Sequence, residues 1–111
     1  MGETEPVTRD MWLYKEYFDL IASGRKTVEV RVGYPNMRRI RPGWLIRFRT
    51  GDEHCLTRVR RVGEYGSFEE MLDPRAIGAT EDRAELLAAI RRIYPPEKEA
   101  LGVLAIEVER V

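Results

Sequence analysis

A helix-to-strand transition within residues 23–31, SGRKTVEVR, constrains this chain more than any other stretch. An apolar run typical of an amphipathic helix precedes it. Gly24 is the natural residue beyond a helix end, because glycine takes a positive φ without a Cβ penalty. From Thr27 the apolar pattern has period two, as in a half-buried strand. The stretch therefore predicts a helix that stops at Gly24 and a strand over residues 27–32.

Three charged side chains gather at this transition. Glu29 and Arg31 fall on the polar face of the predicted strand, and Lys26 lies at the corner, where its side chain can reach over that face. Lysine is uncommon here, since the chain has 16 Arg and 3 Lys. Burial can lower the pKa of an ammonium but not of a guanidinium, which suggests a functional role for Lys26. The alternative is a solvated set of surface ion pairs worth less than about 1 kcal/mol.

Length and composition set the protein class. The chain of 111 residues is expected to form one domain over 1–111, and 43% hydrophobic with 34% charged residues suits a soluble globular fold. Its apolar runs are too short to cross a bilayer. Glu3 and Glu5 replace the basic start of a signal peptide, so a cytoplasmic protein without membrane contact is expected. A lone Cys55 and a single His54 exclude an internal disulfide and a zinc-type site, so no metal or cofactor is expected.

The charge is uneven along the chain although the net charge is zero. Residues 31–61 hold nine basic and two acidic groups, a net charge of +7. Such a segment favours an anionic partner contacted on one side of the protein. The alternative is that these arginines only keep the surface solvated.

The order of elements predicts the fold class. The expected elements are a short strand at 11–13, a helix at 14–23, a strand at 27–32, a basic loop to residue 43, strands at 44–49 and 54–62, a helix opened by the capping box at 67–70, a long helix from 80 to 94 and a last strand at 102–111, at a sheet edge or barrel seam. Hairpin-length turns join the middle strands. We therefore expect an α+β fold, a small and mostly antiparallel β-barrel with flanking helices.

The middle hairpin can be assigned a register. If Thr50 faces Glu53, alternate residues of the two strands share a face. The expected core face holds Trp44, Ile46, Phe48, Cys55, Thr57 and Val59. The opposite face then gathers Arg47, Arg49, His54, Arg58 and Arg60, a basic sheet surface.

The spacing Gly24-x-Lys26-x-x-Glu29-x-Arg31 resembles the GxKxxExR signature of the ASCH domain (activating signal cointegrator homology), a branch of the PUA-like superfamily. Supporting stretches lie at 17–21, 41–44, 67–70 and 102–107. The resemblance covers nearly the whole chain. It implies a PUA-like, mostly antiparallel β-barrel with a cleft beside the signature.

The resemblance also implies a ligand, because ASCH domains are generally taken to bind RNA or nucleotides. The expected partner is single-stranded RNA or a nucleoside or nucleotide, held in a cleft around Lys26, Glu29 and Arg31. A base would stack on an aromatic ring such as Tyr34, Trp12 or Tyr14. The residues expected to form a basic rim and meet phosphates, together with Arg31, are Arg38, Arg39 and Arg41.

An enzymatic function is the alternative. A subgroup of ASCH proteins hydrolyses the amide of N4-acetylcytidine with a lysine, a threonine and a glutamate. Lys26 matches that lysine, but Glu29 stands where the subgroup has its threonine; Thr27 is offset by two positions, and Glu81 is only the nearest candidate for the glutamate. In this alternative Lys26 polarises a carbonyl and Glu29 handles protons as the candidate catalytic pair of a small amidohydrolase.

Overall fold

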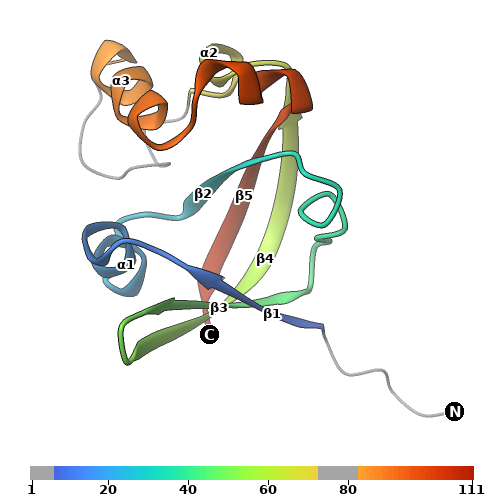
Figure 1. The fold of residues 1–111 in the computed structure, drawn as a ribbon. Helices are drawn as coiled ribbons and strands as arrows, with labels where there is room; N and C mark the ends of the chain where they lie inside the picture. The colour runs from blue at the N-terminus through green and yellow to red at the C-terminus, as the bar shows by residue number, and fades with distance from the viewer. Residues whose placement is uncertain (1–6, 73–82) are drawn as a thin grey trace, which may run out of the picture.

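The computed structural model describes residues 7–72 and 83–111, which form one curled sheet with flanking helices (Figure 1). Its strands are β1 (Thr8–Trp12), β2 (Val28–Val32), β3 (Leu45–Thr50), β4 (Glu53–Tyr65) and β5 (Val103–Arg110). Its helices are α1 (Lys15–Ala22), α2 (Phe68–Met71), α3 (Arg83–Ile93) and a 3₁₀ helix at Pro96–Leu101. None of these described helices has the length and apolar character needed to cross a membrane.

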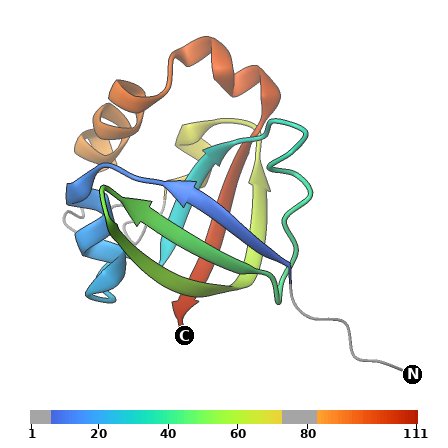
Figure 2. The ribbon, with the colours of Figure 1, turned by 60° about the horizontal axis from the view of Figure 1, so that its bottom comes forward.

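The sheet has the order β1-β3-β4-β5-β2 and curls into a half-barrel (Figure 2). Only the β1–β3 pair is parallel; the other three pairs are antiparallel. The predicted α+β fold with a mostly antiparallel barrel-like sheet is thus confirmed. The last strand was expected at an edge or seam, but β5 has a strand on each side, and the two edges are β1 and β2.

The predicted hairpin register is correct. Thr50 pairs with Glu53 around the turn, where Gly51 has φ 53°. The expected core face lies inward: Ile46 and Thr57 are fully buried, and Thr57 donates from its hydroxyl to the Ile46 carbonyl (2.9 Å). Cys55 is only partly buried, near the turn end of the hairpin.

Two apolar cores lie on the two faces of the sheet. The inner core joins α1 to the concave face of the sheet, and it contains Met11, Phe18, Ile21, Ile40, Ile46, Phe48, Val59, Leu104, Ile106 and Val108. The outer core joins α2 and α3 to β2 and β5, and it contains Val28, Val30, Val32, Phe68, Met71, Ile90, Val103 and Ala105. Strand β2 contributes three valines to the outer core, and Glu29 on its opposite face is buried as well.

The capping box of α2 forms as expected, with one change. Ser67 accepts a hydrogen bond from the Glu70 backbone N–H (3.2 Å), and the Glu70 carboxylate accepts from the Gly66 N–H (2.9 Å), one residue before the cap. The expected start of the long helix at residues 80–82 lies outside the described residues.

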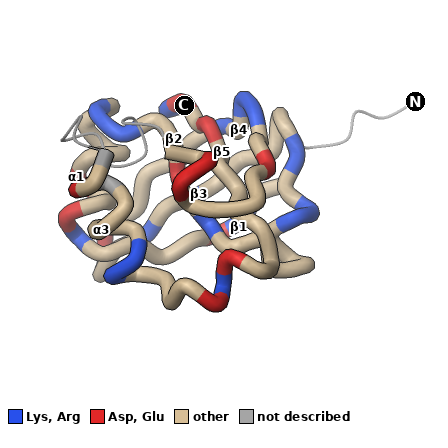
Figure 3. The backbone as a smooth tube through the Cα atoms, turned by 90° about the horizontal axis from the view of Figure 1, so that it is seen from above, with Lys and Arg blue, Asp and Glu red and all other residues tan. Residues whose placement is uncertain are grey.

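The predicted basic sheet surface is partly neutralised by neighbouring strands. Asp10 of β1 pairs with Arg47 and Arg49, and Glu109 of β5 pairs with Arg60. Basic and acidic residues are interspersed over the described chain (Figure 3). A count of charge along the sequence could not include these partners, because they come from strands at opposite ends of the chain.

Candidate nucleic-acid binding site

The site begins where α1 ends. Gly24 has φ 80°, a backbone conformation that favours glycine, and the Lys26 N–H donates back to the Leu20 carbonyl (3.0 Å). This turn carries the chain directly into β2. As a result the Lys26 side chain is buried at the start of the strand, next to the residues that follow it.

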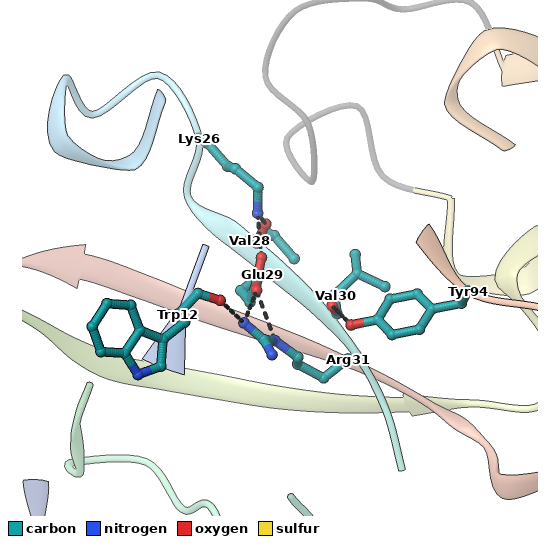
Figure 4. A network of polar contacts seen from close by, with 7 residues as sticks. All are labelled: Trp12, Lys26, Val28, Glu29, Val30, Arg31 and Tyr94. Carbon is teal, nitrogen blue, oxygen red and sulfur yellow. Dashed lines mark hydrogen bonds and ion pairs between the residues drawn. The ribbon is translucent and has the colours of Figure 1, made fainter. Parts of the chain in front are cut away.

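Lys26, Glu29 and Arg31 form one network (Figure 4). The Lys26 ammonium donates to the Val28 carbonyl and to Glu29 Oε1 (2.9 Å), and Arg31 Nε donates to Glu29 Oε2 (2.8 Å). Their side chains are 3%, 8% and 20% exposed, in sequence order. The interpretation of this triplet as a solvated surface ion-pair set is therefore wrong.

Glu29 is held as a carboxylate. Burial alone would raise the pKa of its carboxyl group, but the charges of Lys26 and Arg31 and their hydrogen bonds outweigh burial and hold the pKa below its ordinary value. At neutral pH the network therefore carries two cations and one anion. An ionised Glu29 accepts hydrogen bonds and is a weak proton acceptor for general base catalysis.

The network lies at the open seam of the half-barrel. Strands β1 and β2 are the two edges of the sheet and do not pair with each other. Arg31 spans the gap between them, because its Nη2 donates to the Trp12 carbonyl of β1 (3.3 Å), while its Nε and Nη2 both contact Glu29 Oε2 on β2 (2.8 and 2.7 Å). A side-chain hydrogen bond thus links the two edge strands, which are not paired through their backbones.

The edge of β2 that does not pair with β5 is covered by two further side-chain donors. Lys26 donates to the Val28 carbonyl and the Tyr94 hydroxyl donates to the Val30 carbonyl (3.2 Å). Tyr94 comes from the segment that follows α3 and stacks on Phe68, with ring centroids 5.8 Å apart. Burial raises the pKa of Tyr94 to about 12, so the hydroxyl stays protonated and remains a donor. The edge is therefore protected from pairing with another strand.

A pocket of about 440 Å³ opens beside this seam. The described residues that line it are Trp12, Leu13, Tyr14, Tyr17, Lys26, Glu29, Val30, Arg31, Ile90, Ile93 and Tyr94. The charged triplet supplies all the charged groups among these residues. Trp12 and Tyr14 are 63% and 70% exposed, so two aromatic rings are available to a ligand from solvent. No described group of three or more His, Cys, Asp or Glu side chains could hold a metal ion.

The loop expected to form the basic rim lies elsewhere. Neither Tyr34 nor any of the three loop arginines, Arg38, Arg39 and Arg41, is among the residues that line the pocket. Tyr34 lies under the Lys98 ammonium, 5.4 Å from the ring centroid, and Arg39 is exposed. The structure thus brings together Lys26, Glu29 and Arg31, and it separates the loop from them.

The loop turns away because it is fixed to the far end of the fold. Arg38 donates to the carbonyls of Gly33 (2.9 Å) and Leu101 (2.7 Å) and pairs with Glu64. A Cβ at Gly33 would lie 2.6 Å from the Leu101 oxygen, so only glycine fits this close approach. Arg38 and Arg41 instead line a second hollow of about 520 Å³, together with Arg61.

Comparisons with known proteins identify the family to which this fold belongs. The family model of the ASCH domain matches residues 11–111. The chain belongs to the ASCH domain family. No curated protein matches the chain.

Several solved structures have a fold similar to that of this ASCH domain. It is similar to the crystal structure of hypothetical protein PH0355, with 32% identity, TM-score 0.84 and coverage of 95% of this chain and 100% of that one. It is also similar to the solution structure of protein PF0455 from Pyrococcus furiosus, with 33% identity, TM-score 0.75 and coverage of 95% and 98%. The ASCH domain from Lactobacillus crispatus, 16% identical with TM-score 0.69 and coverage of 94% and 79%, shares the fold.

Of the other expected participants in hydrolysis, Thr27 lies within the part of this ASCH domain that the structure describes, and it is separate from the pocket. Thr27 does not line the pocket, and its hydroxyl oxygen is buried without a hydrogen-bond partner among the described residues. Glu81, the nearest candidate for a third catalytic group, lies outside the described residues. Of the candidate catalytic residues, Lys26 and Glu29 are in contact inside the pocket.

Sequence reasoning missed the wall that α3 and its C-terminal end supply. Ile90, Ile93 and Tyr94 have helical spacing, which predicts a core face, and Ile90 does belong to the outer core. They also line the pocket, as does Tyr17 of α1. Periodicity identifies an apolar face but cannot show that the face also borders a pocket, so the sequence held no signal for this role.

Proposed function

We propose that this ASCH domain binds single-stranded RNA or a nucleotide, with one unpaired base in the pocket at the β1–β2 seam. The observation that supports the proposal is the combination, in one pocket, of a buried charged triplet and two solvent-accessible aromatic rings. Unpaired bases are recognised by stacking on aromatic side chains and by hydrogen bonds to their edges, and this pocket offers both.

The aromatic side chains at the pocket supply the stacking surface in this proposal. Trp12 and Tyr14 leave most of their surface in water, which is unfavourable for aromatic rings unless a ligand covers them. Stacking of a base on an aromatic ring is worth about 1–3 kcal/mol. Tyr34, the third aromatic residue expected to stack, lies outside the pocket lining and is proposed to contact a neighbouring nucleotide instead.

The basic loop supplies phosphate contacts in this proposal. Arg38, Arg39 and Arg41 are exposed, and Arg38 and Arg41 line the second hollow. Arg38 and Arg41 are oriented by hydrogen bonds to backbone carbonyls, which reduces the side-chain entropy lost when they bind an anion. Arg31 lines the pocket itself. In this proposal an RNA with one base in the pocket extends its phosphate backbone toward the loop that follows β2.

The amidohydrolase alternative ranks second. The observation in its favour is the buried contact of Lys26 Nζ with Glu29 Oε1 within the pocket. Against it, both carboxylate oxygens of Glu29 already accept from cations, and its lowered pKa weakens it as a base. Binding needs the charged triplet only as hydrogen-bonding groups, whereas hydrolysis needs Glu29 to take up a proton.

Tryptophan fluorescence tests the binding proposal. The chain has two tryptophans, and Trp44 is replaced by phenylalanine so that Trp12 alone reports on the pocket. Titration with single-stranded RNA is expected to quench Trp12, with affinity that falls steeply between about 50 and about 300 mM NaCl. Undetectable binding at low salt, or an affinity that does not depend on salt, overturns the proposal.

Two variants separate the pocket from the loop. Trp12→Ala, measured by the anisotropy of a labelled RNA, is expected to weaken binding about tenfold with little change in salt dependence. Arg39→Gln is expected to reduce the salt slope by about one while the quench of Trp12 at saturation persists. Both variants are made in the chain that carries Phe in place of Trp44. This replacement leaves the pocket lining unchanged, because Trp44 does not line the pocket.

A deacylation assay tests the enzymatic alternative directly. Purified protein is incubated with acylated cytidines and the release of cytidine is followed by chromatography, with Lys26→Ala as the comparison. The binding proposal expects equally slow release by both proteins. Faster release by the unmodified chain would place hydrolysis first.

A further inference from the structure

The charged triplet presents hydrogen-bonding groups in a defined order. Lys26 can only donate, Glu29 as a carboxylate can only accept, and Arg31 can only donate. Lys26 contacts one oxygen of Glu29 and Arg31 contacts the other, so the acceptor lies between the two donors (Figure 4). The charged part of the pocket therefore has a donor–acceptor–donor pattern.

Each member keeps capacity for a ligand. The Lys26 ammonium has three protons and uses two, on Val28 and Glu29. Arg31 donates from Nε and Nη2, and its Nη1 donates to no residue in the described part of the chain. A carboxylate has about four lone-pair sites, so Glu29 can accept another hydrogen bond. All three residues line the pocket.

One natural RNA base has the complementary edge. The Watson–Crick edge of uracil reads acceptor, donor, acceptor: O4, the N3–H group and O2. Cytosine, which has the same shape, reads donor, acceptor, acceptor and would direct its amino group at a cation and its N3 lone pair at a carboxylate. Guanine has one acceptor and two donors, and adenine has one of each, so neither matches the three groups.

We infer that this pocket selects uracil, with the N3–H group donating to Glu29 and the two carbonyl oxygens accepting from Lys26 and Arg31. The inference rests on the proposed function, since it names the base that the proposed site would read. Its physical basis is that a mismatched edge leaves buried hydrogen-bonding groups without partners, which costs more than a missing contact in water.

Short homopolymers test the inference on the chain with Trp44→Phe. Hexauridylate is expected to quench Trp12 with an affinity about tenfold or more above that of hexacytidylate or hexaadenylate, which have the same charge. Cytidine is the strictest comparison, because it has the same size as uridine. Similar affinities for hexauridylate and hexacytidylate would overturn uracil selection while leaving RNA binding intact, whereas the absence of binding to every oligomer would overturn the proposed function itself.

A pair of methylated oligomers then identifies the atom that is read. Methylation at N3 removes the donor that Glu29 would bind, and methylation at C5 adds the same group but leaves the Watson–Crick edge unchanged. The N3-methylated hexamer is expected to bind about tenfold more weakly than the C5-methylated one. Equal binding of the two would overturn the assignment of Glu29. The comparison uses one folded protein throughout, so no unfolded variant can imitate the result.

Discussion

Two clusters in this ASCH domain have the same arrangement of charges, one carboxylate between two cations, but differ in their exposure to solvent. The buried cluster is Lys26, Glu29 and Arg31, with side chains 3%, 8% and 20% exposed. The exposed cluster is Asp10, Arg47 and Arg49, with side chains 43%, 38% and 31% exposed. The shortest contacts are equally close in both, 2.7 Å from Glu29 to Arg31 and 2.7 Å from Asp10 to Arg47.

The two clusters differ in how far water reaches their charged groups. Around Asp10 the solvent can replace a lost ion pair, so the cluster contributes little to stability and is free to vary. Around Glu29 the three charges depend on one another, because each would be costly to bury without its partner. Burial thus converts an ordinary ion-pair arrangement into a fixed set of hydrogen-bonding groups, which is what a recognition site requires.

The largest difference is expected when the central carboxylate is neutralised. Glu29→Gln leaves two cations at a buried site without a counter-charge, and we expect the free energy of unfolding to fall by about 3–5 kcal/mol. Asp10→Asn, the matched change in the exposed cluster, is expected to lower it far less. Urea unfolding of both variants at neutral pH measures the contrast, and equal losses would show that burial does not distinguish the clusters.

The next largest difference concerns the choice of cation. Lys26→Arg inserts a larger, planar group where the ammonium contacts both the Val28 carbonyl and Glu29, and overpacking is expected to cost about 1–3 kcal/mol. Arg49→Lys in the exposed cluster should change stability little, because water fills the space. The unfolding midpoints of the two variants test this; a Lys26→Arg protein as stable as the unmodified chain would mean that the pocket tolerates either cation.

Local sequence rules predicted the parts of this fold that short-range geometry decides. The helix stop at Gly24, the strand β2 that soon follows it and the Thr50–Glu53 register all follow from neighbouring residues. The burial of Glu29 does not. Period two distinguishes the two faces of a strand, but it cannot show that the charged face lies beside Trp12, whose carbonyl accepts from Arg31.

The separation of the basic loop from the pocket was equally out of reach. Arg38 follows Arg31 closely in sequence, yet it is held by Leu101 and Glu64, which lie far along the chain. Tyr94 illustrates the same limit, since its bond to Val30 joins residues 64 positions apart. Such long-range contacts depend on how the whole sheet curls.

A smaller change in the free energy of unfolding is expected at Tyr94, which lines the pocket beside the buried cluster and has no counterpart at the exposed one. Tyr94→Phe removes the hydrogen bond to the Val30 carbonyl and should cost about 1 kcal/mol. The raised pKa of Tyr94, about 12 against an ordinary 10.0, adds a pH signature. The folded state favours the protonated hydroxyl, so this stabilisation is complete below pH 10 and is lost as the pH rises toward 12. The unfolding free energy of Tyr94→Phe should therefore fall less steeply in this range, and Tyr14→Phe, at an exposed ring, serves as the control.

The smallest effect concerns acid and salt together. The hydrogen bond from Arg47 lowers the pKa of Asp10. Burial would raise the pKa of Glu29, but the two cations beside it outweigh burial, so this pKa is lowered as well. Both carboxylates therefore stabilise the fold above the pKa of the unfolded chain and lose that contribution as the pH falls through the folded value. About 1 M NaCl screens exposed charges but reaches buried ones poorly. In acid titrations of stability, the difference between Asp10→Asn and the unmodified chain should disappear at high salt, while the difference for Glu29→Gln should remain. If salt removed both differences, the network around Glu29 would have to be open to solvent, and its donor–acceptor–donor order could not select a base.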